Sequence, residues 1–244
     1  MKNNEHGKQV STLLEEARNV NGAHDYSTSV FSATLYLSMA KTKPHTREEQ
    51  ALRKQGFRSI AGVDEAGKGS WAGPIVAAAV ILPESFPPSL VNDSKQLTEK
   101  QREKMFVHVT RHAVAWAVGV ISAKEIDQKG IVAANKKAML TALKKLHVRS
   151  DAILVDALKI KVGKKPVKAI IRGDAKVLSI AAASIVAKVV RDALMIGQHR
   201  LYPQYAFHDH KGYGTAKHQA LLKQHGPSAI HRRSFRPMKT DSKR

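Results

Sequence analysis

The 244-residue sequence lacks cysteine entirely. Disulfide bonds and thiolate chemistry are therefore excluded, and any bound metal must be held by oxygen atoms or imidazole nitrogens. No apolar run approaches the roughly 18 residues that a membrane-spanning helix needs, and residues 1–10 carry no apolar signal core. We therefore expect a protein that is not exported and works in the cytoplasm without contacting a membrane.

Acidic residues are scarce as well. Asp and Glu number 20 against 41 Lys and Arg, which gives a formal net charge of +21. Residues 1–58 hold nine basic and six acidic side chains, so the rest of the chain carries +18 of that charge. Such a surplus favours a polyanionic partner, above all nucleic acid. Charge alone does not separate DNA from RNA or binding from cleavage, and a basic protein that is merely soluble stays an alternative.

The first 58 residues differ from the remainder and are interpreted as an N-terminal extension that is mainly helical. They contain few apolar clusters, no strong strand signal and a linker-like stretch at residues 41–46. The extension could add a helical surface for a substrate or a partner. Residues 59–244 are expected to form the main domain, which is long enough to bury a proper core.

The main domain is expected to alternate between strands and helices. Apolar runs predict strands at 60–65, 75–82, 113–121, 152–156 and 167–171, and a glycine-rich turn joins the first two as a hairpin. Helices are expected at 98–111, 131–147, 175–200 and 215–225, with capping-box patterns at 98–101 and 122–125. This order predicts an α/β fold in which helices cover the faces of a mixed sheet.

Four acids stand at the ends of these elements. Asp64 and Glu65 end the first strand, Asp156 ends the fourth, and Asp174 precedes the long helix. Each alone has an ordinary structural explanation, as a strand-to-turn residue or a helix N-cap. Neighbours in a regular strand point to opposite faces. For Asp64 and Glu65 to share a site, we therefore expect the backbone to kink, which the glycines that follow would permit.

Taken together, the four carboxylates indicate a metal site. Crowded carboxylates repel one another and burial raises their pKa, so a hard cation is needed to stabilise the cluster. Carboxylate and water ligands suit Mg²⁺ or Mn²⁺, and two such ions would promote phosphodiester hydrolysis. The pattern therefore predicts a nuclease. A basic nucleic-acid-binding protein without turnover is the alternative; it would explain the charge but not the placed acids.

Other polar residues receive more ordinary interpretations. Six of the twelve histidines fall at or after residue 199. Surface positions near phosphate are favoured over a metal site for His208, His210 and His218. Residues 181–184 are interpreted as close helix packing, and Arg191 with Asp192 as a structural pair on the long helix.

Several ordered motifs resemble those of the ribonuclease HII family of bacteria and archaea. Val63-Asp-Glu-Ala-Gly-Lys-Gly69, followed by Ala72-Gly-Pro74, is similar to its opening motif, and Asp93-Ser-Lys-Gln-Leu97 to its second. Arg172-Gly-Asp-Ala-Lys176 is similar to the stretch around its fourth acid, and residues 179–192 to its long-helix signature. Residues 210–215 and 226–235 resemble its closing motifs, so the resemblance covers about 60–238.

The resemblance implies a ribonuclease H-like fold with a mixed five-stranded sheet and C-terminal helices. It also implies that four carboxylates bind the metal and serve catalysis, with Mg²⁺ or Mn²⁺ as cofactor: Asp64, Glu65, Asp156 and Asp174. Asp156 lies in the shortest of the matching motifs.

Residues that meet the substrate are implied in the same way. Gly67, Lys68 and Gly69 match a loop whose backbone senses the 2′-hydroxyl, the group that distinguishes RNA from DNA. Tyr213 matches a tyrosine that stacks on the sugar beside the ribonucleotide, and Lys95 matches a lysine that contacts phosphate. Lys68 departs from the family pattern, which usually has arginine there, and so lacks a guanidinium fork for phosphate.

The activity implied is endonucleolytic hydrolysis of the RNA strand of RNA/DNA hybrids. It includes ribonucleotide excision, by cutting 5′ of ribonucleotides embedded in duplex DNA, and it leaves 5′-phosphate and 3′-hydroxyl ends. We expect a monomer whose partners are these nucleic acids. A ribonuclease HIII-like enzyme or a DNA nuclease of the same fold remains the alternative within this class.

Overall fold

The computed structural model describes residues 43–88, 91 and 97–239. All of them belong to one compact unit, Thr42–Arg244. Most of the expected extension, residues 1–58, lies outside the described residues, so its helical character and its boundary remain predictions.

A mixed sheet of five strands, in the order β3-β2-β1-β4-β5, forms the centre of the unit. β1 (Ile60–Ala66) pairs antiparallel with β2 (Ile75–Ile81) and parallel with β4 (Ala152–Asp156). β3 (Ala115–Ile121) lies antiparallel beside β2, and β5 (Val167–Ile170) lies parallel beside β4. The predicted mixed sheet and the first hairpin are confirmed.

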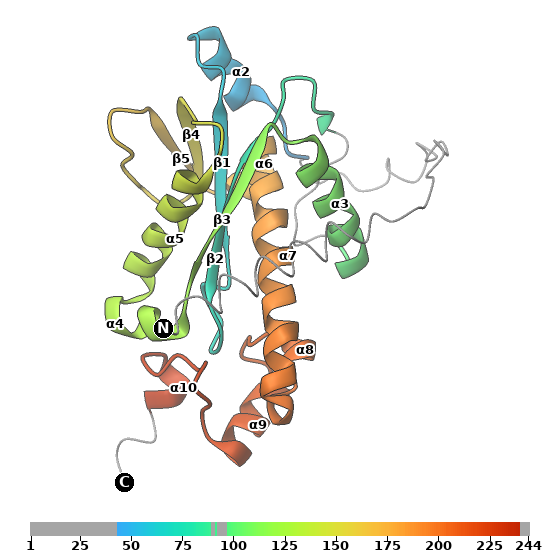
Figure 1. Ribbon diagram of the computed structural model, residues 1–244, viewed down its shortest axis with the longest axis vertical. Coiled ribbons are helices and arrows are strands. Elements are labelled where there is room, and N and C mark those ends of the chain that lie inside the picture. Colours follow the sequence, from blue (N-terminus) through green and yellow to red (C-terminus); the bar gives the residue numbers. More distant parts are fainter. Residues whose placement is uncertain (1–42, 89–90, 92–96, 240–244) are drawn as a thin grey trace. The chain divides into compact units, whose positions relative to one another are not determined.

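Helices cover both faces of the sheet, as Figure 1 shows. α4 (Ala123–Lys129) and α5 (Ile131–Lys145) lie on one face, whereas α3 (Glu99–His112) and α7 (Leu178–Leu201) lie on the other. Side chains of a strand alternate between faces, so the apolar run of β2 serves both cores. Its even-numbered residues pack with α3 and α7, and its odd-numbered residues pack with α5.

Two helix starts follow the predicted capping patterns to different degrees. At α3, the Thr98 hydroxyl accepts from the Gln101 backbone and the Gln101 side chain accepts from the Thr98 backbone, which completes the capping box. At α4, the Ser122 hydroxyl accepts from the Glu125 backbone at 3.2 Å. The Glu125 carboxylate instead pairs with Lys137 and Lys129, at 2.5 and 3.0 Å.

The stretch expected to form one helix from residue 175 is divided. α6 (Gly173–Lys176) is followed by Val177, which is extended at φ −115° and ψ 124°, and α7 begins after it. The interruption has a tertiary cause, because Val177 bridges to His45. The His45 amide donates to Lys176 O at 2.9 Å and its carbonyl accepts from the Leu178 amide at 3.1 Å. The long helix therefore starts later than predicted.

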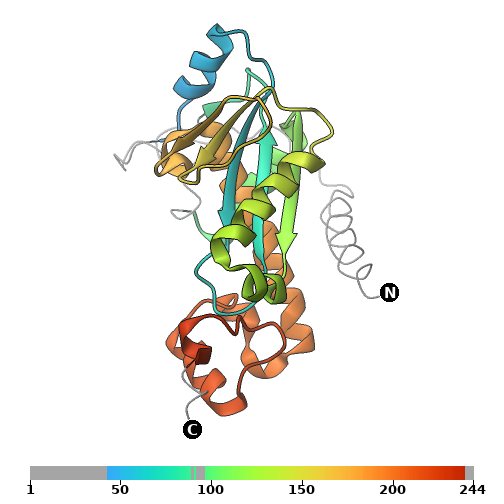
Figure 2. The same ribbon diagram turned by 90° about the vertical axis from the view of Figure 1, so that its left-hand side faces the viewer.

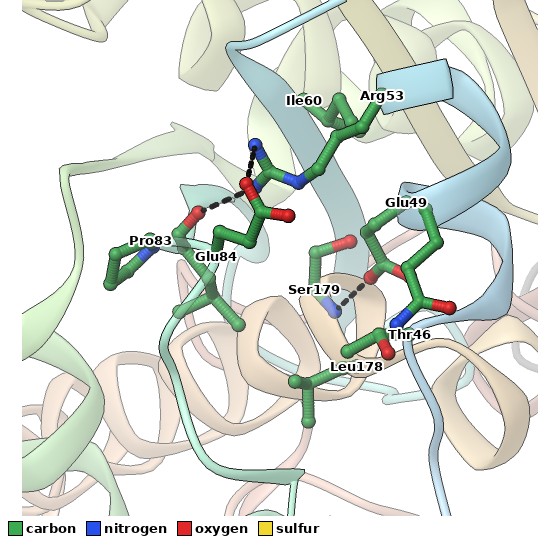
Figure 3. Close-up of a pocket in the computed structure, with 10 residues that line it drawn as sticks. Thr46, Glu49, Arg53, Ile60, Pro83, Glu84, Leu178 and Ser179 are labelled. Carbon is green, nitrogen blue, oxygen red and sulfur yellow. Dashed lines mark hydrogen bonds and ion pairs between the residues drawn. The ribbon is translucent and has the colours of Figure 1, made fainter.

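α2 (Arg47–Lys54) closes the first turn of α7 beside a small pocket, shown in Figure 3. The buried Glu49 carboxylate accepts from the Ser179 amide at 2.9 Å, where α7 would otherwise leave an amide unpaired. Arg53, from the same helix, lies 3.5 Å from Leu82 O and 3.8 Å from Glu84. α2 thus supplies the cap that Val177, the residue preceding α7, does not provide.

The C-terminal helices gather around the end of α7, near the turn between β1 and β2 (Figure 2). They are η3 (Pro203–Tyr205), α8 (Phe207–His210), α9 (Ala216–His225) and α10 (Arg236–Lys239). A small cluster of Ala72, Met195, Tyr205 and Phe207 joins them to that turn. Among the described helices, none combines the length and apolar character required to cross a membrane.

Candidate active site

Two of the candidate acids meet where neighbouring parallel strands run side by side. The register pairs Val63 of β1 with Val155 of β4, which places Asp64 beside Asp156. Polar groups at the carboxyl ends of adjacent parallel strands face the same edge of the sheet, where α/β proteins commonly bind ligands. The structure therefore brings together carboxylates that are 92 residues apart in the sequence.

Asp64 is the most strongly perturbed of these acids. It is buried, with 4% exposure, and its Oδ1 accepts from the Glu65 amide at 2.7 Å. Burial raises the pKa of Asp64 well above its usual range, and repulsion from Glu65 and Asp156 raises it further. A hydrogen bond from the Ser184 hydroxyl on α7 opposes this rise. The Asp64 carboxylate therefore stands in a place that disfavours its negative charge.

The backbone at Glu65 is not kinked, contrary to the prediction. β1 stays regularly paired with β2 through Ala66, so the expected kink between the two acids is absent. In such a strand Asp64 lies on the α7 face together with Ala66, and Glu65 lies on the opposite face. The Glu65 carboxylate lies 3.8 Å from the Lys68 ammonium. The two adjacent carboxylates are close enough to repel each other, but they leave the strand in different directions.

Asp174 is carried to the same region by α6, a single helical turn that begins with Gly173 and Asp174. The Gly173 amide donates to Asp156 Oδ1 at 2.7 Å, and Asp174, which is buried, accepts from the Ala175 amide at 3.0 Å. A Cβ at Gly173 would lie 2.7 Å from the Ile180 side chain. A glycine therefore allows this turn to sit against α7 and to present its amide to Asp156.

The donor chemistry of this edge fits a hard divalent cation. All four candidate ligands are carboxylates, which suit Mg²⁺ or Mn²⁺, and the repulsion at Asp64 is the kind that such a cation relieves. As placed in the part of the chain that the structure describes, no three Asp, Glu or His side chains converge closely enough to hold an ion. Backbone amides engage all three aspartates: the next residue's amide donates to Asp64 and to Asp174, and the Gly173 amide donates to Asp156. The carboxylates would therefore have to turn to share a cation.

The loop of Gly67, Lys68 and Gly69 and the ring of Tyr213 both lie against one arginine of α7, Arg191. Arg191 is fully buried, and its Cζ lies 4.9 Å from the centre of the Tyr213 ring. Gly67 has a φ of +89°, and a Cβ there would lie 1.9 Å from Arg191 Nε. The Lys188 ammonium lies 5.0 Å from the same tyrosine ring, so two cations face it. The two segments expected to meet the substrate thus share a rigid support.

The guanidinium of Arg191 is bonded to backbone carbonyls on both of these segments. It donates to Pro74 O at 3.1 Å, Ala72 O at 3.2 Å and Lys211 O at 3.0 Å. Burial lowers the pKa of this guanidinium, and the three carbonyls supply the acceptors that a buried cation requires.

A second buried arginine reaches the loop from the C-terminal segment. Arg232 Nη1 donates to Lys68 O and its Nε donates to Gly73 O, each at 3.0 Å. Burial and the nearby Arg191 lower the pKa of Arg232 to about 9. The Arg232 amide also donates to Trp71 O at 2.8 Å. The loop of residues 67–74 is therefore tied at several backbone carbonyls by side chains far away in the sequence.

Several of these supporting residues were assigned other roles from the sequence. Ser184 was interpreted as helix packing, yet its hydroxyl bonds to Asp64. Asp192 forms its ion pair with Lys188 at 2.8 Å, whereas Arg191 donates to carbonyls. Surface positions were favoured for His210 and His218, but both are buried. Lys95 lies outside the described residues, so its predicted phosphate contact remains a prediction.

Comparison with known proteins places these features in a family. The model of the family described as Ribonuclease HII matches residues 61–238. Ribonuclease HII of Roseiflexus castenholzii is 49% identical over 205 residues, which cover 82% of this chain and 92% of that protein.

Solved structures agree with the fold. The crystal structure of ribonuclease H2 from Pyrococcus horikoshii superimposes with a TM-score of 0.64 and 29% identity, over 74% of this chain and 95% of that one. Bst-RNase HIII, solved in complex with Mn²⁺, gives a TM-score of 0.58 at 19% identity and covers 82% of this chain and 74% of that one. The latter similarity shows the ribonuclease H-like fold alone.

Proposed function

Since this chain belongs to the ribonuclease HII family, we propose that it cuts nucleic acid with the four carboxylates at its sheet edge, Asp64, Glu65, Asp156 and Asp174. Members of the family are metal-dependent endoribonucleases that act on RNA paired with DNA. The chain is accordingly an endonuclease of RNA/DNA hybrids. The observation that supports the residue assignment best is the buried Asp64 beside Asp156, in a chain with a large basic surplus.

The metal ion proposed for this edge is Mg²⁺ or Mn²⁺, held by those carboxylates. When bound, such an ion supplies Lewis-acid activation of a water molecule and neutralises charge on the scissile phosphate. The contribution of Asp64 is a carboxylate that the Glu65 amide and the Ser184 hydroxyl keep at this edge of the sheet. The Gly173 amide holds Asp156 in the same way.

Recognition of the ribonucleotide is assigned to the loop of Gly67, Lys68 and Gly69 together with Tyr213. A Cβ added at Gly69 would meet nothing within 4 Å, so this part of the loop offers open space for a ribose to approach its backbone. The Tyr213 ring is fixed by Arg191 and Lys188 and can stack on a sugar. Cleavage is proposed to occur 5′ of a ribonucleotide embedded in duplex DNA, leaving 5′-phosphate and 3′-hydroxyl ends.

The charge and composition support two further parts of the proposal. The basic surplus would hold the phosphate backbone of a hybrid or of DNA that contains ribonucleotides. We also propose that the enzyme acts as a monomer in the cytoplasm, a reducing compartment that suits a chain without cysteine.

Asp64→Asn tests the metal assignment. It should abolish cleavage of a hybrid with Mg²⁺ or Mn²⁺, while binding of a fluorescent hybrid survives. In metal-free buffer the variant should be at least as stable as the parent, because it removes a charge that burial and repulsion disfavour. Asp151→Asn is the matched control: it lies at the other end of β4 and binds the Arg58 and Ser59 amides.

The substrate is tested with duplex DNA that contains one ribonucleotide. Cleavage on its 5′ side is expected in the parent and in Asp151→Asn. Full activity of Asp64→Asn would refute the metal assignment, and cleavage of all-DNA duplex at the same rate would favour a DNA nuclease.

A further inference from the structure

Three histidines are buried between α8, α9 and the segment that precedes α10, close to the glycine loop. His218 is fully buried, and His231 and His210 have 2% and 8% exposure. His210 and His218 stack with their ring centres 4.3 Å apart. Aromatic rings of Trp71 and Phe207 contact His218. Packing alone would be served by apolar side chains, so the reason for imidazoles must lie in their hydrogen bonds.

The hydrogen bonds determine which nitrogen of each ring carries the proton. His218 Nδ1 lies 2.9 Å from Tyr213 O, and a carbonyl only accepts, so this nitrogen is protonated. His231 Nδ1 accepts from the Ser228 amide at 2.9 Å, so its proton is on Nε2. The two Nε2 atoms are 3.0 Å apart. His231 Nε2 must therefore donate to His218 Nε2, and both rings are neutral.

This neutral state is also favoured by the surroundings. Burial lowers the pKa of His218 to about 4 and that of His231 to about 3. The neighbouring His210 is in a matching arrangement, because its Nε2 donates to Tyr205 O and its Nδ1 accepts from the Gly212 amide. Arg233 is a further charge that disfavours protonation of His231. Across the neutral pH range the arrangement of donors and acceptors is fixed.

The bonds join the two segments that are proposed to meet the substrate. At one end, Ser228 bonds to His231, the residue before Arg232, and Arg232 bonds to the carbonyls of Lys68 and Gly73. At the other end, His218 donates to the carbonyl of Tyr213, which also accepts from the Thr215 amide at 2.9 Å. His231 makes none of these bonds to Tyr213 itself, so the side-chain hydrogen bonds connect it to the tyrosine through His218.

We propose that His231 and His218 form a relay of neutral imidazoles that sets the backbone position of Tyr213, and that both are positioning residues for recognition of the ribonucleotide. The proposal rests on the proposed function for the part that concerns activity. Its structural part concerns only the chain of hydrogen bonds from Ser228 to Tyr213. A role in core stability alone is the competing explanation.

Substitutions at His231 separate the two explanations, because Asn and Gln each retain one end of a histidine. His231→Asn can still accept from the Ser228 amide but loses the bond to His218. His231→Gln can still donate to His218 but loses the bond to Ser228. If the relay acts, His231→Asn lowers kcat/KM on the single-ribonucleotide duplex about tenfold, a magnitude typical of slight misplacement. His231→Gln retains most of the activity, although both remove the same ring.

Spectroscopy tests the relay without relying on activity. With isotope-labelled imidazole nitrogens, nuclear magnetic resonance should show one protonated nitrogen on each ring and a coupling across the bond between the two Nε2 atoms. The backbone amide resonances of Tyr213 and Gly214 should shift in His231→Asn and stay near their parent positions in His231→Gln. If His231→Asn fails to fold, the relay is tested by the parent spectrum and by His218→Gln. That variant should lose the bond to Tyr213 O but keep the bond to His231.

A double-mutant cycle links the relay to the tyrosine. In a Tyr213→Ala background, His231→Asn should cause no further loss of kcat/KM, because the residue through which it acts is gone. Losses that multiply, or Tyr213 resonances that do not move, would overturn the relay. Normal cleavage by Tyr213→Ala itself would instead refute the proposed role of Tyr213, and the spectra would still decide on the relay.

Discussion

Gly62, in the middle of β1, allows α7 to lie directly against the sheet. A Cβ built at this position would stand 2.1 Å from the Ser179 carbonyl carbon and 2.5 Å from the Ile180 amide nitrogen. Both are backbone atoms of α7, so no side-chain rotation can relieve the contact. An ordinary contact begins at 3.4 Å. In Gly62→Ala, the helix and the strand must therefore separate by most of that difference.

The separation affects both stability and activity. Overpacking a tight interior typically costs about 1–3 kcal/mol, and we expect the upper end or more because a backbone must move. Asp64 is two residues away and Ser184, its hydrogen-bond partner, is on the displaced helix. A misplacement of about 1 Å can reduce a rate on the order of a hundredfold. Activity should therefore fall well below the parent even at temperatures at which the variant is folded.

Urea unfolding followed by circular dichroism measures the first effect, and cleavage of a hybrid below the unfolding transition measures the second. Gly197→Ala, in α7, is the matched control, because a Cβ there meets nothing within 4 Å. That change should stabilise the protein by about 0.5–1 kcal/mol through helix propensity. If Gly62→Ala were as stable and active as the parent, the close approach of α7 to β1 would be wrong.

Two further predictions concern buried basic side chains. His218 and His231 have pKa values lowered to about 4 and 3, against 6.5 for an ordinary histidine. The unfolded chain therefore binds more protons below pH 6.5. Stability from these rings should be complete above that pH and decline as the pH falls toward 4, by up to about 1.4 kcal/mol per pH unit for each ring. Urea unfolding at several pH values measures this, and a flat profile that persists down to pH 4 would contradict it. In Arg191→Met, one buried and two partly buried carbonyls lose their donor, which should cost about 3 kcal/mol; a loss below about 1 kcal/mol would mean that water replaces the guanidinium.

Much of the fold could be predicted because its signals are local. The strands are mostly apolar runs, and β1, β2, β4 and β5 each have a glycine, proline or acid next to at least one end. The Thr98 capping pattern forms in full. The start of the long helix could not be predicted in this way. Val177 is extended because His45, more than a hundred residues earlier, bonds on either side of it. Nothing in the sequence around Val177 records that partner.

The candidate acids were found for the same local reason, since each stands near the end of a strand or at the start of a helix. The shape of the site was less accessible. Asp64 and Glu65 were expected to share a kinked backbone, but continuous pairing with β2 keeps β1 regular. The residues that support the loops were missed, because Arg191, Arg232 and His231 act on backbone groups distant in sequence. A single buried arginine or histidine produces no periodic pattern in the sequence from which its role could be predicted.

The contact between α2 and α7 affects how the protein can be shortened. The family match begins at residue 61, and a truncation guided by that limit would discard Glu49 and His45. The Ser179 amide would then lose its acceptor, Glu49. The extended backbone at Val177 would lose its bridge partner, His45. Both lie immediately after the turn that carries Asp174. A minimal enzyme should therefore retain the chain from residue 43, even though the residues before 61 carry no catalytic motif.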